Sequence, residues 1–240
     1  MKNFIFTMCV TVLSITAHCQ KIKEIKGNEN IITTTRATSE YDQLEISGSF
    51  DVKLIAGKEG NITIKGDENI ISYLKTEVKN DVLEIKMEKN TRIKYNYKSS
   101  LEITIPFTKI DKITFTGSGN LKNEDKISNN TFQFVMEGSG NVNFVADFKT
   151  LKIIKSGSGN LFVKGTASSV DVTTSGSGNA NLFDLKSENA NANLSGSGNI
   201  NIYCTNSLQA NTSGSGTINY KGNPENVNKN SVGSGGVFPK

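Results

Sequence analysis

The chain has 240 residues, a hydrophobic fraction of 35%, 22 glycines against 3 prolines, and a formal net charge of +4. This composition is typical of a folded chain with many turns, and it excludes an intrinsically disordered one. The 27 basic and 23 acidic residues are mixed along the sequence without a basic cluster among aromatic residues, so we expect no nucleic-acid partner.

Residues 1–19 have the features of a signal peptide. Lys2 supplies a positive charge, residues 4–17 are mostly apolar, and the small side chains of Ala17 and Cys19 suit cleavage directly after them. Lipid attachment at Cys19 is the alternative, but the histidine before it disfavours such processing. We therefore expect export to the periplasm, the cell surface or the medium. No later apolar run is long enough to cross a bilayer, so we expect no transmembrane segment in the mature chain.

Cleavage at this point would remove His18, which is the one histidine, together with Cys9 and Cys19. The mature chain would hold no histidine, no tryptophan and a single thiol, Cys204. With one thiol it could not form an internal disulfide. Without histidine it could form neither a Ser-His-Asp nor a Cys-His site. It could also not form a zinc site built on imidazole or on several thiolates. We expect a protein that is not an enzyme, with no catalytic residue, no cofactor and no metal. Cys204 itself is expected to be a small core or turn residue.

The first half of the mature chain reads as a series of strands. Residues 20–40 are polar and rich in threonine, which predicts a linker with a possible first edge strand at 31–35. In residues 41–116 apolar and polar residues alternate with a period of two, the pattern of β-strands joined by tight turns. A short helical turn is expected only within 68–77. The alternating runs are 44–46, 50–54, 62–64, 82–87, 93–97 and 101–105.

Basic residues gather around Tyr95 and Tyr97 near the end of this half. One interpretation is a small patch that binds acidic polymers such as an anionic polysaccharide. The interpretation we favour is an edge strand whose charges discourage edge-to-edge pairing. The basic residues are Lys89, Arg92, Lys94 and Lys98.

A tetrapeptide repeat organises residues 117–240. Gly-Ser-Gly-Asn begins at residues 117, 138, 157, 176 and 196, and degraded copies begin at 214 and 233. The intervals between starts are 21, 19, 19, 20, 18 and 19 residues. A constant period near 20 residues is typical of a solenoid that stacks coils of one shape. We therefore predict an all-β solenoid with coils of about 19 residues, preceded by a strand-rich N-terminal half that is continuous with it.

Alignment of the copies predicts two strands in each coil. The second and fourth residues after the turn point inward, as do the residues six and four before it. A loop of this length, at ~3.3 Å per residue, encloses a narrow stack of side chains and leaves little room for a cavity. The predicted inward pairs before the turns are Phe132/Phe134, Leu151/Ile153, Val170/Val172, Ala190/Ala192 and Leu208/Ala210. The apolar tail, with Val237 and Phe238, is expected to cap the last coil.

The repeated residues themselves are predicted to be structural. Glycine permits a positive φ or a close approach of two backbones at each corner. The aligned asparagines are expected to stack and to hydrogen-bond along the column as an amide ladder. The predicted turn and ladder residues are Gly117, Gly119, Asn120, Gly138, Gly140, Asn141, Gly157, Gly159, Asn160, Gly176, Gly178, Asn179, Gly196, Gly198 and Asn199.

The repeat can be compared with three kinds of binding site: for dinucleotides, for calcium and for saccharides. A dinucleotide-binding loop would need a third glycine and a following helix, and Phe162 occupies the place of that glycine in the third copy. Calcium-binding coils would need a carboxylate at one register, whereas the aspartates lie in different registers. Both are rejected. A face of Ser and Asn residues that binds saccharides weakly, with Phe162 or Tyr203 as a stacking platform, stays open.

An ordered set of motifs in this sequence resembles a known family. The motifs are Gly48-Ser49-Phe50-Asp51-Val52, Lys65-Gly66-Asp67-Glu68-Asn69, Val82-Leu83-Glu84-Ile85, Ile103-Thr104-Ile105-Pro106 and the Gly-Ser-Gly-Asn repeats. Together they resemble the head GIN domain family of auto-transporter adhesins, over 41–240. The resemblance implies one domain over these residues, a right-handed β-helix-like solenoid and an exported, surface-associated location. It implies adhesion as the function and carries over no catalytic residue.

Our leading hypothesis is an exported, non-enzymatic β-solenoid that serves as an adhesin or as a binding or structural protein of the cell envelope. Its partner would be an envelope or extracellular glycan or protein. The alternative is a β-helix that binds or cleaves polysaccharide, which would need carboxylates such as Glu45, Glu84 or Glu102 to converge with a basic residue. A scaffold that acts through protein–protein contact is the third hypothesis.

Overall fold

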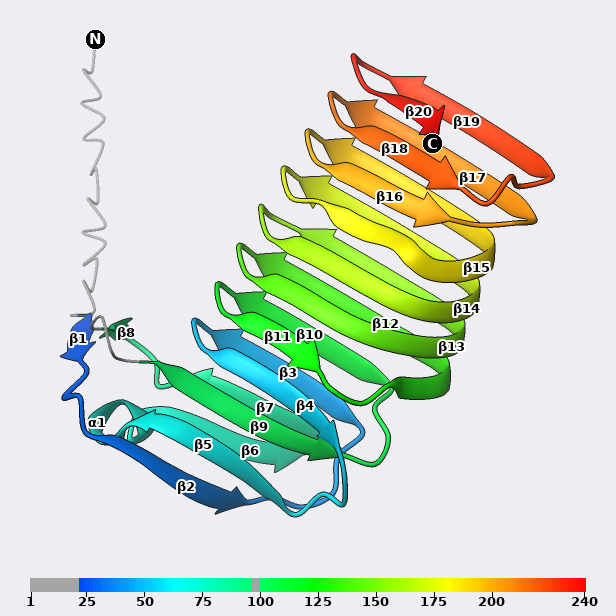
Figure 1. Ribbon diagram of the computed structural model, residues 1–240. Coiled ribbons are helices and arrows are strands. Elements are labelled where there is room, and N and C mark those ends of the chain that lie inside the picture. Colours follow the sequence, from blue (N-terminus) through cyan, green and yellow to red (C-terminus); the bar gives the residue numbers. More distant parts are fainter. Residues whose placement is uncertain (1–21, 96–99) are drawn as a thin grey trace, which may run out of the picture.

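The structure is a computed structural model that describes residues 22–95 and 100–240. Most of these residues lie in strands, and their one helix is α1 (Glu68–Ile71) (Figure 1). The predicted signal peptide lies outside the described residues. The strands are β1 (Lys23–Lys26), β2 (Ile31–Ala37), β3 (Gln43–Gly48), β4 (Asp51–Ala56), β5 (Asn61–Asp67), β6 (Leu74–Lys79), β7 (Val82–Met87), β8 (Thr91–Lys94), β9 (Leu101–Phe107), β10 (Lys112–Gly117), β11 (Asn120–Asn123), β12 (Ile127–Gly138), β13 (Asn141–Ser156), β14 (Asn160–Gly176), β15 (Ala180–Gly196), β16 (Asn199–Tyr203), β17 (Ser207–Gly214), β18 (Thr217–Lys221), β19 (Asn226–Val232) and β20 (Gly236–Pro239).

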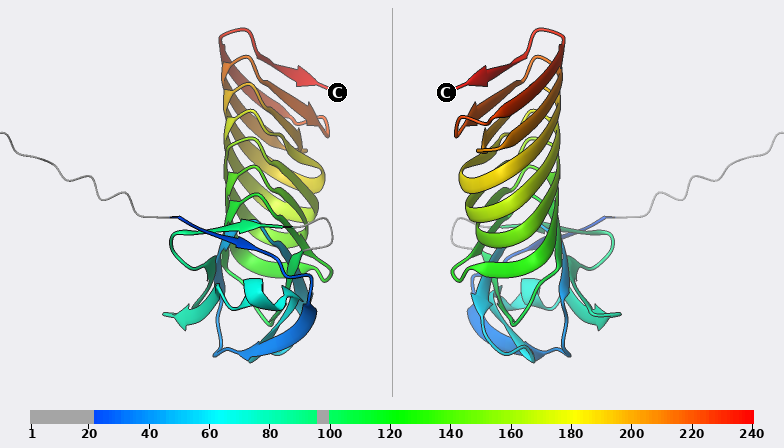
Figure 2. Two further views of the ribbon diagram at one scale, coloured as in Figure 1. Left: turned by 90° about the vertical axis from the view of Figure 1, so that its left-hand side faces the viewer. Right: turned by 90° about the vertical axis from the view of Figure 1, so that its right-hand side faces the viewer.

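Most of these strands wind into flattened coils that stack into an elongated solenoid (Figures 1 and 2). In each coil one strand leads into a Gly-Ser-Gly turn and a second strand leads out. The entry strands pair in parallel as one sheet, and the exit strands pair in parallel as another, which we name the entry sheet and the exit sheet. The long strands β13, β14 and β15 each leave one turn in the exit sheet and bend into the entry sheet of the next coil. The predicted all-β solenoid is confirmed; the right hand of its winding stays a prediction.

The N-terminal end of the solenoid is closed by antiparallel strands. β3 and β4 form a coil that is covered on both sides. β10 and β11 stack on one side of it, and β7 and β9 stack on the other. Beyond these, β6 pairs antiparallel with β7, β5 pairs antiparallel with β9, and β2 forms the edge next to β5. The change from parallel to antiparallel pairing ends the stack at this side.

Several local predictions for the first half can be compared with this arrangement. The edge strand expected at 31–35 is β2. The helical turn expected within 68–77 is only the short α1, because β6 resumes the sheet at Leu74. The sequence pattern missed β1, which pairs in parallel with β8 as a separate two-stranded sheet.

Arg92 and Lys94 of the predicted basic patch lie on β8, and Lys94 pairs with Glu24 on β1 at 3.7 Å. Lys89 lies just before that strand. Tyr97 and Lys98 lie outside the described residues. The described part of the patch is therefore a strand of a small peripheral sheet, in keeping with the favoured interpretation.

The core is a thin column of apolar side chains between the two sheets. All the predicted inward pairs before the turns are buried. Phenylalanine fills the wider N-terminal coils: the Phe132 ring stacks on Phe148 with centroids 4.6 Å apart and meets Phe144 edge-on at 5.9 Å. Towards the C-terminus alanine takes the equivalent positions in Ala190 and Ala192. The core therefore narrows along the stack in the order that the sequence predicts.

One inward column next to the turns contains polar residues. It consists of Phe115, Met136, Lys155, Thr174 and Leu194, which are neighbours in register. The Lys155 side chain is 1% exposed, and its Nζ has one hydrogen bond, a 3.4 Å contact to the carbonyl oxygen of Gly157. The hydroxyl of Thr174 is also buried and has no hydrogen-bond partner in the described part of the chain. Burial lowers the pKa of Lys155, because the charged ammonium is deprived of water.

The tail that was expected to cap the last coil is the strand β20. It pairs with β18 and buries Val237 beside Ile218, whereas Phe238 is 49% exposed. The last strand of the entry sheet, β19, carries Lys229 in register with the buried Ala210. Its Nζ lies 4.7 Å from the centre of the Tyr220 ring and 3.5 Å from the carbonyl oxygen of Val237. An inward-pointing charge at a sheet edge opposes the addition of another strand.

Candidate functional site

The Gly-Ser-Gly turns form one edge of the solenoid. The first glycine of a copy has a positive φ, for example +100° at Gly176, which a residue with a Cβ adopts only under strain. The second glycine is needed for a different reason. A Cβ at Gly159 would lie 2.6 Å from Cε of Met136 and closer still to the carbonyl oxygen of Gly140. The turn amides of Ser158 and Gly159 both donate to the Gly138 carbonyl in the preceding coil, at 3.0 and 3.0 Å.

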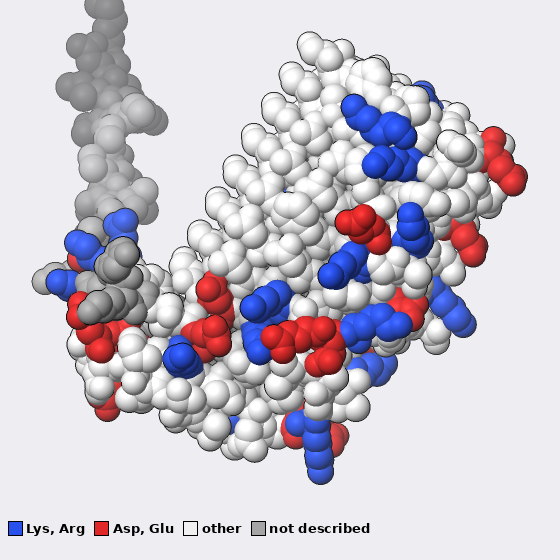
Figure 3. Space-filling model, in the orientation of Figure 1, with Lys and Arg blue, Asp and Glu red and all other residues white. Residues whose placement is uncertain are grey.

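An amide ladder runs beside the turns. Asn141, Asn160, Asn179 and Asn199 each donate from Nδ2 to Oδ1 of the asparagine in the preceding coil, at 3.4, 3.2, 3.2 and 3.0 Å. Asp51 accepts from Asn120 at the start of the ladder, and Thr217 donates to Asn199 at its end. Since these amides bond one another, the ladder holds coils together and offers few free groups to a ligand. Figure 3 shows that the later coils of this edge, at the upper left of the view, are almost free of Lys, Arg, Asp and Glu.

Removal of one amide from the ladder is expected to weaken the fold modestly. In Asn179→Ala, the main-chain amide and the Nδ2 group of Asn199 both lose their acceptor. We expect the free energy of unfolding to fall by about 1–2 kcal/mol. Chemical denaturation followed by circular dichroism measures this. The control is Asn143→Ala, since the exposed Asn143 side chain has no hydrogen-bond partner among the described residues. Equal stabilities of the two variants would contradict a structural ladder.

The outward face of the exit sheet carries a second aligned row. Lys122, Asn143, Phe162, Asn181, Asn201 and Asn219 follow one another in register. At its C-terminal end, Asn201 donates to Asn181 at 2.5 Å and Asn219 donates to Asn201 at 2.9 Å. Phe162 interrupts this row with a ring that is 45% exposed. Phe162 is one of the two rings expected from the sequence as possible stacking platforms for a sugar, and its side chain is exposed to solvent.

A β-bulge next to Phe162 creates a cleft. The register between β14 and β15 shifts between the pairs Phe162↔Asn181 and Lys164↔Asp184, so β15 contains one residue more than β14. This insertion is the origin of the 20-residue interval between Gly176 and Gly196. It leaves Phe183 on the outward side, and a cleft of about 510 Å³ lies here across β11, β13, β14 and β15. We name it the bulge cleft; its lining is Lys122, Asn123, Asn143, Phe144, Val145, Phe162, Val163, Lys164, Asn181, Phe183 and Asp184.

A second concave surface lies where the exit sheet bends into the entry sheet. This corner groove has a volume of about 850 Å³ and crosses several coils. Its lining is polar apart from Phe148, Ala167 and the Tyr203 ring. The lining consists of Ser128, Asn129, Asn130, Asp147, Phe148, Lys149, Thr166, Ala167, Ser168, Lys186, Ser187, Glu188, Tyr203 and Thr205.

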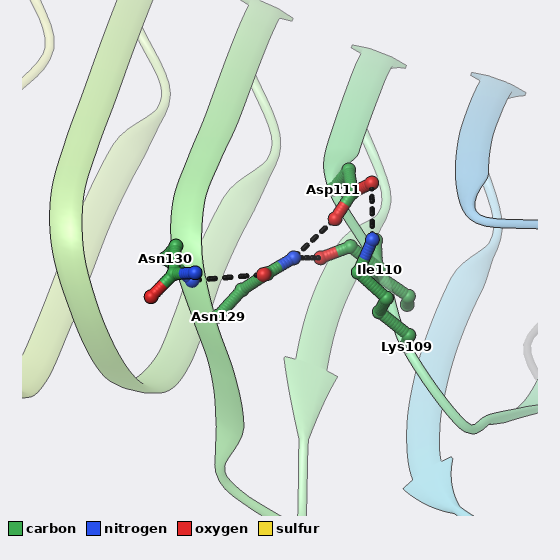
Figure 4. Close-up of polar contacts among 5 residues, drawn as sticks. All are labelled: Lys109, Ile110, Asp111, Asn129 and Asn130. Carbon is green, nitrogen blue, oxygen red and sulfur yellow. Dashed lines mark hydrogen bonds and ion pairs between the residues drawn. The ribbon is translucent and has the colours of Figure 1, made fainter.

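Side chains near both ends of the corner groove make polar contacts with neighbouring residues. At the N-terminal end, the Asn129 amide donates to the carboxylate of Asp111, which Lys109 also pairs at 2.7 Å (Figure 4). Asn129 in turn accepts from the main-chain amide of Asn130. Near the C-terminal end, Nζ of Lys186 lies 3.8 Å from the centre of the Tyr203 ring, at the distance of a cation–π contact. Tyr203, the second platform expected from the sequence, is thus covered by Lys186.

Asp147, one of the two carboxylates that line the corner groove, is poorly suited to donate a proton. Lys126 and Thr166 both hydrogen-bond the carboxylate of Asp147, at 2.8 and 2.7 Å. These two bonds hold the pKa of Asp147 below its usual value, and the group remains charged near neutral pH. Glu188 lies on a coil further along the solenoid. A carboxylate that is always charged can bind a cation or a hydroxyl group, but it cannot donate a proton to a leaving group.

The carboxylates expected for a cleaving enzyme are distributed over both sheets. Glu45 and Glu84 are neighbours in register on β3 and β7, and Glu84 pairs with Lys86. Glu102 lies on β9 in the exit sheet, opposite Lys65. None of the three lines the bulge cleft or the corner groove.

Two further features concern reactive groups. Cys204 is buried, as predicted, and burial raises the pKa of its thiol to about 11, so the thiol stays protonated near neutral pH. Within residues 22–95 and 100–240, no group of three or more His, Cys, Asp or Glu side chains is placed to hold a metal ion. In the same described segments, no helix has the length and apolar character of a membrane span.

Comparison with protein families decides the classification. The family model described as "Putative auto-transporter adhesin, head GIN domain" matches residues 40–224. This chain belongs to the head GIN domain family. The match spans the N-terminal strands as well as most of the repeat, as the resemblance over 41–240 predicted. Among functionally curated proteins, none matches this head GIN domain chain.

Solved structures share the architecture of this head GIN domain protein. A putative adhesin from Bacteroides fragilis is 24% identical, with a TM-score of 0.84, and the alignment covers 90% of this chain and 100% of the other. A structure from Parabacteroides distasonis, titled a putative lipid binding protein, is 29% identical with a TM-score of 0.74 and covers 91% and 100%. A putative adhesin from Parabacteroides merdae is 19% identical with a TM-score of 0.66 and covers 91% and 99%.

The two concave surfaces of this head GIN domain were not identified from its sequence, apart from Phe162 and Tyr203. The corner groove depends on where each coil bends, which follows from coil packing rather than from a repeated motif. The bulge cleft did have a signal, since the interval after Gly176 is one residue longer than the common 19. That signal marks an insertion without showing which side chain it turns outward.

Proposed function

We propose that this protein is an exported, non-enzymatic adhesin of the cell envelope, which binds an extracellular or envelope glycan through the outward face of the exit sheet and the adjoining corner groove. The family description and the signal-peptide features of residues 1–19 support export and adhesion. The rigid ladder of coils provides a long, fixed surface on which a repeating polymer can make repeated contacts.

The observation that carries the proposal is the chemistry of the two concave surfaces. Their outward groups are mainly amides, hydroxyls, ammonium groups and aromatic rings, which recognise sugar hydroxyls and sugar ring faces. Asp147, one of the two carboxylates that line the corner groove, is held in its charged form by Lys126 and Thr166. Such a surface favours binding over hydrolysis.

Export is tested by locating the full-length chain in cells. We expect envelope or extracellular localisation and cleavage by protease added to intact cells. Leu13→Asp, which interrupts the apolar run of the predicted signal peptide, is expected to retain the chain in the cytoplasm. Cys19→Ser separates simple export from lipid anchoring, since only an anchored protein would be released by that substitution. A wild-type chain found only in the cytoplasm would contradict the proposal.

Binding is tested on a glycan array with the purified chain, and the released sugars are analysed by chromatography. We expect retention on a subset of glycans without the appearance of shorter products. Retention of none, or the release of shortened oligosaccharides, would count against a non-enzymatic glycan adhesin.

A further inference from the structure

Phe162 occupies a position at which the fold does not require an aromatic ring. Its register neighbours on both sides, Asn143 and Asn181, are amides, and the row continues as Asn201 and Asn219 before it ends at Phe238 in the last coil. The ring is 45% exposed, so burial of its surface contributes little to folding. An exposed aromatic ring on a rigid strand is available for contact with a ligand.

The bulge places a second ring beside the same cleft. Phe183 is the additional residue of β15, and a bulge of this kind turns a side chain in a direction that regular pairing does not allow. Nζ of Lys221 lies 4.4 Å from the centre of the Phe183 ring. The cleft is thus lined by aromatic rings on two neighbouring strands, Phe162 on β14 and Phe183 on β15, and its volume of about 510 Å³ is sufficient for one or two sugar rings.

The charge around the cleft is predominantly positive. Lys122 and Lys164 are exposed, and neither ammonium group has a hydrogen-bond or ion-pair partner among the described residues. Asp184 is the single carboxylate of the lining. Free ammonium groups on strands that are fixed by parallel pairing form a ready site for an anion. Asn143 and Asn181 add amide donors between the lysines.

We propose that the bulge cleft binds an acidic sugar residue of a polysaccharide. The sugar ring stacks on Phe162 and Phe183, and the carboxylate or sulfate pairs with Lys122 and Lys164. This inference rests on the proposed function and specifies the ligand class of the same face. The lining combines two lysines and three asparagines with the rings of Phe162 and Phe183, which matches a hydroxylated, charged ring better than a continuous acyl chain.

The experiment measures binding of the full chain to polygalacturonate, hyaluronate and chondroitin sulfate by affinity electrophoresis and calorimetry. Methyl-esterified polygalacturonate is the uncharged counterpart of the first. We expect at least one acidic polymer to bind at least tenfold more tightly than the ester. The binding should weaken as the salt concentration rises, since exposed charges are screened.

Two variants assign this binding to the cleft. Phe162→Asn, which introduces the residue of the neighbouring coils, is expected to weaken binding at least tenfold with unchanged thermal stability. Lys164→Gln is expected to remove most of the preference for the acid over the ester. The matched control is Phe238→Asn, since Phe238 is 49% exposed on the same face but lies outside the cleft. The control should bind as the wild type does.

Vesicles of phosphatidylglycerol are tested beside the polymers, as an anionic lipid surface. Four results would overturn the inference: no acidic polymer binds, the ester binds as tightly as the acid, Phe162→Asn binds as tightly as the control variant, or the chain binds only to the vesicles. Retention of neutral glycans on the array together with any of these results would leave the proposed adhesin function standing and remove only the acidic-sugar cleft. Failure of both export and array binding would remove the proposed function itself.

Discussion

Replacement of Lys155 by methionine is expected to raise the free energy of unfolding by about 1–3 kcal/mol at pH 7. The Lys155 side chain is 1% exposed, yet its ammonium group has a single long hydrogen bond, to the carbonyl oxygen of Gly157. A buried charge with too few partners opposes folding. Methionine already occupies the same column one coil earlier, at Met136, so a methionine side chain is compatible with the packing of this column.

The gain from Lys155→Met should depend on pH in a defined direction. Burial lowers the pKa of Lys155 in the folded protein below its usual value of 10.5. Between the folded pKa and 10.5 the unfolded chain binds more protons than the folded chain, so the stability of the wild type rises with pH across that window. The advantage of the variant is therefore largest below the folded pKa and becomes smaller as the pH approaches 10.5.

Urea denaturation at several pH values between 6 and 10 measures both effects. Lys152→Met is the control, because Lys152 lies on the same strand with its side chain exposed. It is expected to change stability by less than about 0.5 kcal/mol. A variant at position 155 that is less stable than the wild type at pH 7 would show that the ammonium group has partners that stabilise it.

Substitution of Gly159 by alanine is expected to lower the free energy of unfolding by about 3 kcal/mol or more. The new Cβ would overlap the carbonyl oxygen of Gly140, and this oxygen belongs to the main chain of the preceding coil. Relief of the overlap requires the two coils to separate locally, which disturbs the amide donors of Ser158 and Gly159 to Gly138 as well. The loss should appear as a lower denaturant midpoint.

Two comparisons test the cause of this loss. Gly57→Ala is the control, because a Cβ there lies at an ordinary distance of 3.7 Å from Cβ of Pro106. Met136→Ala combined with Gly159→Ala should restore little stability, because the nearer obstacle is the main chain rather than the Met136 side chain. Equal stability of Gly159→Ala and Gly57→Ala would mean that the coils are spaced more loosely than the structure shows.

The repeat allowed most of the solenoid to be predicted from the sequence. Every coil reuses one turn and one inward pattern, so the alternation around Val142 or Ile153 defines both sheets without knowledge of distant contacts. The N-terminal arrangement could not be predicted in this way. That β10 returns to lie beside β3 depends on pairing across more than 60 residues, for which the local pattern holds no information.

The candidate site was less accessible to sequence analysis for a related reason. Phe162 was recognised because a large apolar residue stood at an outward position of the repeat. Phe183 and Lys164 stand at the bulge, where the register itself changes, and alignment on the Gly-Ser-Gly-Asn motif cannot show on which side of the sheet an inserted residue emerges. Lys155 was missed because its position next to the turn was not among the inward positions considered.

The coil formed by β3 and β4 has a consequence for how such proteins change over evolution. One of its sides receives the non-repeating strands β7 and β9, and the other receives the first coil of the repeat. Every later coil contacts only the coils before and after it. Duplication or loss of a single 19-residue unit, such as the one between Gly138 and Gly157, therefore alters neither the antiparallel closure nor Lys229 at the far end. Each such event changes the length of the solenoid by ~4.8 Å, so gene duplication can adjust its length without altering either end.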